Sequence, residues 1–156
     1  RWFRNGMTEI LFYHLERQSL EEALPKLLER SIDRGWKSIV QTTTRERLEA
    51  LDALLWTYDD QSFLPHAADS EPNLEDEPIV LTTGGGNPNA AQVRFLVEAA
   101  PFPSDASNYQ RIVLMFDGGD EEAVAGARGA WKELRASGHE LTYWQQNESG
   151  RWEKKA

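Results

Sequence analysis

The clearest strand signal in the chain is Glu9-Ile10-Leu11-Phe12-Tyr13-His14-Leu15, a run in which apolar and aromatic residues are almost continuous. Such runs are typical of a strand covered on both faces of a parallel sheet. After it, Ser19 precedes two glutamates, which favours a helix N-cap, and leucines then recur at helical spacing until Gly35. The sequence therefore predicts a strand over 9–15 and a helix over 19–34.

The same order of strand and helix continues beyond Gly35. A second helix is predicted to begin after Thr44 and to end at Trp56, and a third is predicted from Asp120 to about residue 137, where Gly138 ends it. Apolar runs predict the remaining strands over 36–42, 78–82, 93–99, 110–116 and 141–145. Alternating strands and helices indicate an α/β fold whose parallel sheet has right-handed crossovers.

Length and composition agree with one folded domain. The chain has 156 residues, of which 40% are hydrophobic and 10% aromatic, enough to build a core. Residues 1–6 precede the first Met and are set apart as an extension or a cloning scar, so the domain is assigned to 7–156. The sequence has no Cys, which excludes disulfides and thiolate metal sites. Without an apolar run of membrane-spanning length or a signal segment, we expect a soluble protein, by default in the cytoplasm.

Charge disfavours a protein that binds duplex DNA directly. The chain has 17 Lys and Arg against 26 Asp and Glu, a net charge of −9, whereas strong binding to phosphates needs clustered cations. Seven of the acidic residues fall in the span 59–77, which has no Lys or Arg. We expect this acidic span to be a mobile surface loop.

Motifs for catalysis are missing. The run Gly84-Gly85-Gly86 invites a phosphate-binding loop, but Asn87 and Pro88 follow it where such a loop needs Lys and then Ser or Thr. The three histidines are not at metal-binding spacing, and no Ser stands in a G-x-S-x-G elbow. We therefore expect no cofactor, no metal and no catalytic residue. A degenerate nucleotide-binding enzyme that uses the Gly84–Gly86 loop remains the alternative.

The third predicted helix has two faces. At about 100° per residue, we assign Ala123, Ala127 and Leu134 to the side that packs on the sheet and place Ala130 outside it. The other face combines one aromatic side chain with three cations and a valine, namely Val124, Arg128, Trp131, Lys132 and Arg135.

Two interpretations of this second face are open. Trp131 could belong to the border of the core, with the cations favoured by the helix dipole. Alternatively, the face is a pocket for a short acidic and hydrophobic peptide, because Trp and Arg often dominate interface energies and Arg binds carboxylates with two hydrogen bonds. Single-stranded nucleic acid stacked on Trp131 is a competing ligand that the net charge disfavours.

Four segments together resemble the chi subunit of bacterial DNA polymerase III, and the resemblance extends from Met7 to about Trp152. They are Ile10-Leu11-Phe12-Tyr13, Leu51-Asp52-Ala53-Leu54-Leu55-Trp56, Ser62-Phe63-Leu64-Pro65-His66 and the stretch from Arg128 to Gly138. The resemblance implies a single Rossmann-like domain with a mostly parallel sheet and helices on both faces. It also implies a clamp-loader-associated accessory subunit in DNA replication, whose nucleotidyl transfer is performed by another subunit of the polymerase.

The resemblance further implies two partners. Chi subunits receive the acidic, Phe-terminated C-terminal tail of single-stranded DNA-binding protein, and the matching positions here are Arg128, Trp131 and Lys132. Val124 stands where family members can carry Lys, so either the tail binds more weakly here or another cation, such as Arg135, substitutes for that Lys. The second partner is the small subunit psi, and the surface that would face it comprises Trp56, Phe63, Leu64 and Pro65. The alternative for that surface is a loop packed back on its own domain.

Overall fold

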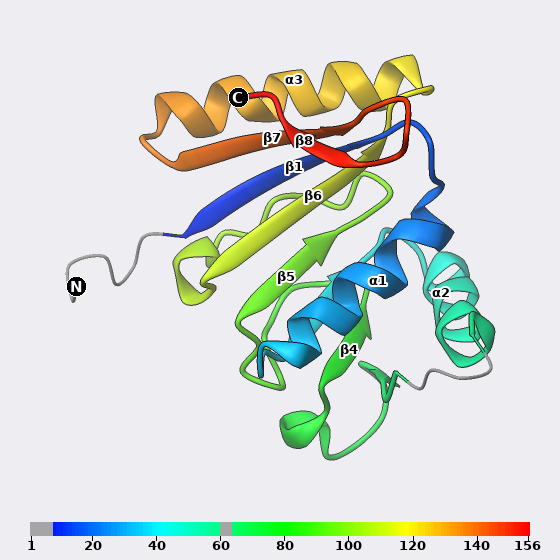
Figure 1. Cartoon of the computed structure of the whole chain (residues 1–156). Helices are drawn as coiled ribbons and strands as arrows, with labels where there is room; N and C mark the ends of the chain where they lie inside the picture. The colour runs from blue at the N-terminus through cyan, green and yellow to red at the C-terminus, as the bar shows by residue number, and fades with distance from the viewer. Residues whose placement is uncertain (1–7, 60–63) are drawn as a thin grey trace.

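The computed structural model describes residues 8–59 and 64–156. The elements that the chain forms first are β1 (Glu9–Leu15), α1 (Leu20–Asp33), β2 (Ser38–Gln41), α2 (Arg45–Thr57), β3 (Ala67–Ala68) and β4 (Ile79–Thr82). Those that follow are β5 (Val93–Leu96), β6 (Arg111–Asp117), α3 (Glu121–Ala136), β7 (Glu140–Gln146) and β8 (Trp152–Lys154). The strands join in one sheet of order β3-β4-β2-β5-β6-β1-β7-β8 (Figure 1). Neighbouring strands are parallel except β7 and β8, so the predicted α/β class with a mostly parallel sheet is confirmed.

Local side chains begin each helix as the sequence predicts. Ser19 and Glu22 form a reciprocal capping box at the start of α1, and the Thr44 side chain accepts a hydrogen bond from the Arg47 backbone N–H at the start of α2. Asp120 accepts hydrogen bonds from two backbone N–H groups at the start of α3. These caps satisfy backbone N–H groups that the first turn of a helix leaves unpaired, and so they fix the residue at which each helix begins.

The helices cover the two faces of the sheet (Figure 1). Residues of α1 and α2 pack with Leu11, Val113 and other strand residues of the same face in the largest core cluster. On the other face, α3 packs over β1 and β7, where it contacts Ile10 and Phe12. Successive residues of a strand point to opposite faces, so β1 contributes to both layers.

The acidic span 59–77 departs from the predicted loop. β3 lies within it and pairs in parallel with β4 at the edge of the sheet. Leu64, His66, Ala67 and Leu74 are buried, and a short 3₁₀ turn covers Leu74–Asp76. The apolar residues between the carboxylates therefore fix much of this span to the domain. Residues 60–63 lie outside the described ranges.

The C-terminal segment contains a strand that the sequence analysis missed. β8 pairs antiparallel with β7, and Trp152 packs on Tyr13 with ring centroids 4.7 Å apart. Across the described residues, no helix combines the length and apolar character that crossing a membrane requires.

Candidate functional site

The packing of α3 on the sheet determines which of its residues are available to a partner. Leu134 is buried, and Ala127, Ala130 and Trp131 pack partly buried on the same cluster as Phe12. The placement of Ala130 outside the packing side was therefore wrong. Ala130 and Leu134 are four steps of about 100° apart along the helix, which leaves their side chains only about 40° apart around its axis.

Trp131 lies at the edge of this layer. Its ring meets Phe12 edge to face, with centroids 5.2 Å apart, and meets Tyr143 in a similar geometry at 5.8 Å. The indole is half-buried, so one part belongs to the core border and the other part faces solvent. Trp131 thus belongs to the border of the core, which fixes the ring beside an open surface, and the peptide-pocket interpretation of that surface stays a prediction.

Arg128 is exposed and precedes Trp131 by three residues, on the same side of α3. Within the described part of the chain its side chain makes no ion pair or hydrogen bond. Burial raises the pKa of the Tyr143 hydroxyl, and the positive charge of Arg128 opposes this shift, which places the guanidinium within electrostatic reach of the phenol. The hydroxyl oxygen of Tyr143 lies 2.7 Å from Nδ1 of His14, within hydrogen-bond distance. A cation without an ion pair in the described residues is therefore within electrostatic reach of a fixed hydroxyl group.

The remaining residues of this face extend the positive surface. Lys132 and Arg135 are exposed and have no ion pair in the described residues, and Val124 is half-buried one turn before Arg128. We call the set the α3 basic face, which comprises Val124, Arg128, Trp131, Lys132 and Arg135. It can bind an anion through its cations and an apolar group against Trp131.

Sequence reasoning missed the strand residues beneath the α3 basic face. Phe12 and His14 point to the α3 side of β1, and Phe12 is the register partner of Tyr143 on β7. The alternation of Phe12 and His14 within the first strand was a usable signal for a shared face. Their proximity to α3 depends on the strand order, which periodicity does not report.

The predicted psi-facing residues separate in the structure. Trp56 is 55% exposed, the one exposed large hydrophobic side chain in the described ranges, and its ring centroid is 4.5 Å from that of His66. Leu64 is only 2% exposed and belongs to the core, so its placement on a partner surface is corrected. Pro65 is half-buried, and Phe63 lies outside the described residues.

His66 holds this region against α2. The buried ring has Nε2 3.0 Å from Asp52 Oδ1 and Nδ1 2.7 Å from the carbonyl oxygen of Leu64. These contacts fix the chain beside Trp56, so Trp56 and Pro65 remain as the candidate apolar surface among the described residues.

The loop at Gly84–Gly86 has a structural role, because its backbone carbonyl groups bind a buried side chain. Arg94 is fully buried and donates hydrogen bonds to the carbonyl oxygens of Gly84 at 2.6 Å and Gly86 at 2.9 Å. These carbonyls face the guanidinium of their own domain. This contact weakens the alternative of a nucleotide site formed by the loop.

A cleft of about 950 Å³ opens at the carboxyl ends of the strands, where open α/β sheets commonly bind ligands. Its lining is strongly acidic and includes Glu16, Glu21, Glu98, Asp117, Asp120 and Glu122. Arg17 is the one cation in the lining. This charge opposes a phosphate ligand. The described residues also contain no cluster of three or more potential metal ligands.

Comparison with known proteins identifies a family and a relative. Residues 7–142 match the family described as DNA polymerase III chi subunit, HolC. A protein of Rickettsia prowazekii (strain Madrid E), described as probable DNA polymerase III subunit chi, is 27% identical over 121 residues, which cover 71% of each chain.

Proposed function

Because this chain belongs to the DNA polymerase III chi-subunit family, we propose that it is a non-catalytic accessory subunit that links the clamp loader to single-stranded DNA-binding protein. Membership of the family supports an accessory role in DNA replication. The specific contact we propose is between the α3 basic face and the acidic, Phe-terminated tail of that protein.

The observation that carries this proposal is the position of exposed Arg128 three residues before half-buried Trp131, on the same side of α3. An exposed guanidinium without an internal partner can bind a carboxylate, and the fixed indole beside it offers an apolar surface to an aromatic residue. Tyr143 completes the base of the site. The Val124 side chain supplies no charge, so Lys132 and Arg135 are the cations that attract the other acidic residues of the tail.

The second contact we propose is with psi or an equivalent clamp-loader component. Its support is the exposure of Trp56, since an aromatic residue held beside a buried histidine is a typical interface anchor. Pro65 and Phe63 would extend that surface.

The test of the tail contact is a titration of a labelled acidic peptide ending in Phe. We expect micromolar binding, about −8 kcal/mol, because a short peptide loses chain entropy and has few anchors. Arg128→Ala should weaken binding by about 2 kcal/mol, as expected for a hot-spot truncation. Trp131→Ala should do the same, with circular dichroism and thermal unfolding as checks, because the ring also packs on Phe12.

The matched control is Arg17→Ala, which removes another exposed arginine and should leave the affinity unchanged. A peptide with an amidated C-terminus should bind more weakly than the free acid. Unchanged affinity in both Arg128→Ala and Trp131→Ala would exclude the α3 basic face as the tail site.

A further inference from the structure

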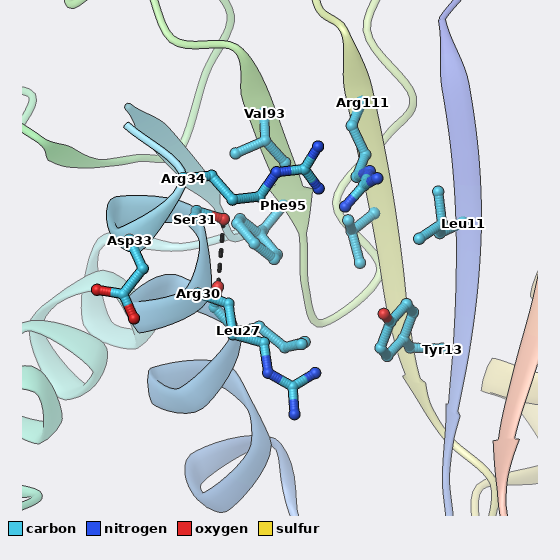
Figure 2. Close-up of a pocket in the computed structure, with 11 residues that line it drawn as sticks. Leu11, Tyr13, Leu27, Arg30, Ser31, Asp33, Arg34, Val93, Phe95 and Arg111 are labelled. Atoms are coloured by element: carbon cyan, nitrogen blue, oxygen red, sulfur yellow. Dashed lines mark hydrogen bonds between the residues drawn. The ribbon is translucent and has the colours of Figure 1, made fainter. Parts of the chain in front are cut away.

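A second basic site lies on the opposite face of the sheet from α3. A pocket of about 400 Å³ opens between the C-terminal half of α1 and the strands β1, β5 and β6 (Figure 2). Its base is apolar and its rim carries three arginines. The apolar lining residues are Leu11, Leu27, Val93, Phe95 and Val113.

The three arginines come from two elements. Arg30 is in the last turn of α1, Arg34 is the C-cap residue of that helix, and Arg111 begins β6. Figure 2 shows the side chains of Arg34 and Arg111 reaching toward one another across the pocket. Two like charges held in this way repel each other, and an anion between them would relieve the repulsion.

Trp36 keeps two of these guanidinium groups in place. The Arg34 guanidinium carbon lies 4.0 Å from the centroid of the Trp36 ring, and that of Arg111 lies 5.2 Å from it. Arg111 also pairs with Glu9 at 2.8 Å. By contrast, the side chains of Arg30 and Arg34 make no hydrogen bond or ion pair with the described residues. Arg34 is therefore a cation that Trp36 positions and that no carboxylate of the described residues neutralises.

Tyr13 adds a hydroxyl to this group of donors. Its ring lines the pocket, and its hydroxyl has no hydrogen-bond partner in the described part of the protein. Burial raises the pKa of this hydroxyl, while the charges of Arg111 and Arg30 oppose the shift, so both guanidinium groups are within electrostatic reach of it. Asp33 is the single carboxylate in the lining, and Figure 2 shows it directed away from the three arginines.

We propose that this pocket binds the 5′-phosphate of a nucleotide, either free or at the end of a nucleic-acid strand. A carboxylate is satisfied by one guanidinium, whereas a dianionic phosphate monoester has three terminal oxygens and can use two or three. The apolar base and the partly buried Tyr13 ring can contact the flat nucleobase. The volume is within the range of small-ligand sites, roughly 300–1,000 Å³.

The test is a calorimetric titration of the full chain with 2′-deoxyadenosine 5′-monophosphate, inorganic phosphate and deoxyadenosine. The nucleotide should bind at least about tenfold more tightly than either part alone, because the phosphate and the base occupy different parts of the pocket. Arg30→Gln and Arg34→Gln should each weaken nucleotide binding by about tenfold. Both residues are on the helix surface, and unchanged thermal unfolding will show that the variants are folded.

The control variant is Arg17→Gln, which changes an exposed cation that does not line the pocket and should leave nucleotide binding unchanged. Absence of nucleotide binding, equal affinity for inorganic phosphate, or unchanged affinity in both Arg30→Gln and Arg34→Gln would overturn the proposal. A 5′-phosphorylated oligonucleotide that binds more tightly than the mononucleotide would identify a strand end as the ligand, and the reverse order would identify the free nucleotide.

An acidic peptide ending in Phe separates this site from the tail site. If its binding were weakened by Arg34→Gln and unaffected by Arg128→Gln, the pocket would be a peptide site and the nucleotide proposal would be overturned. Loss of peptide binding in Arg128→Gln alone leaves the two sites independent, as we expect.

Discussion

Arg94 on β5 donates two hydrogen bonds to the side-chain oxygen of Gln41 on β2, from Nε at 3.1 Å and from a terminal nitrogen at 2.8 Å. The same guanidinium donates to the hydroxyl of Tyr109 at 2.8 Å and to the carbonyl oxygens of Gly84 and Gly86. One buried side chain thus connects two neighbouring strands with the glycine loop and with the segment before β6.

Arg94→Met should destabilise the fold by about 3–5 kcal/mol, because it leaves the acceptors of this network buried without a donor. The measurement is the free energy of unfolding in urea. Arg45→Met is the control, since that arginine is at the surface and its side chain pairs only with Asp69 among the described residues. Its cost should be below about 1 kcal/mol. A similar cost for the two variants would contradict the structural role of Arg94.

Gly118 is predicted to be intolerant of a side chain. It follows β6, and its N–H donates to the carbonyl oxygen of Leu15 at 2.7 Å. A Cβ at this position would overlap the His14 ring and lie 2.8 Å from that carbonyl oxygen. Gly118→Ala should therefore cost on the order of 1–3 kcal/mol in unfolding free energy, as overpacked sites do.

Substitution of Gly126 is expected to have the opposite effect on stability. It lies within α3, and a Cβ there would meet nothing within 4 Å. Gly126→Ala should stabilise the protein by about 0.5–1 kcal/mol through helix propensity. If both substitutions changed the unfolding free energy by the same amount, steric crowding around Gly118 would not be the cause of the destabilisation.

The sequence predicted the elements whose signals are local. The first strand is continuous in apolar residues, and the caps Ser19, Thr44 and Asp120 begin the three helices as expected. By contrast, β3 is two alanines and β8 is three residues with one Trp, so neither has a periodic pattern. Both exist because a neighbouring strand offers free backbone groups, which is a tertiary effect.

The candidate sites divide in the same way. The α3 basic face was predictable because its residues share one helix. Tyr143 and His14 were not, since the sheet order brings β7 and β1 under α3. In the pocket beside α1, the sequence indicates only that Arg34 is a cation near a helix end. The structure shows that its guanidinium lies over Trp36 and that its side chain faces Arg111.

Ionisation of Tyr13 should lower the free energy of unfolding as the pH rises in the alkaline range. Its pKa in the folded protein is raised, chiefly by burial, so the folded state keeps the proton where the unfolded chain loses it. This contribution to stability is full below about pH 10 and is lost as the pH rises through the folded pKa. Tyr13→Phe should reduce the fall in unfolding free energy between about pH 9 and pH 11. An identical fall in the variant would contradict the assignment.

Trp56 should contribute more to binding than to folding. Because the ring is more than half exposed, Trp56→Ser should change the unfolding free energy by no more than about 1 kcal/mol. Binding to psi should fall by on the order of 2 kcal/mol if Trp56 is an anchor of that interface. Both are measurable on one preparation, by thermal unfolding and by titration. A large loss of stability with unchanged binding would identify Trp56 as a structural residue.

Salt dependence should distinguish Lys132 from Arg128 on the α3 basic face. Arg128 lies beside Trp131 and Tyr143, where a bound carboxylate is partly shielded from water, whereas Lys132 is exposed and would act at longer range. Lys132→Ala should therefore cost less than Arg128→Ala, below about 1 kcal/mol, and its cost should nearly disappear at about 0.5 M salt. Arg128→Ala should remain costly there, because hydrogen bonds to a carboxylate are screened less than distant charges. Titrating the acidic peptide into both variants at low and high salt measures this difference, and an equal salt response would show that the two cations act in the same way.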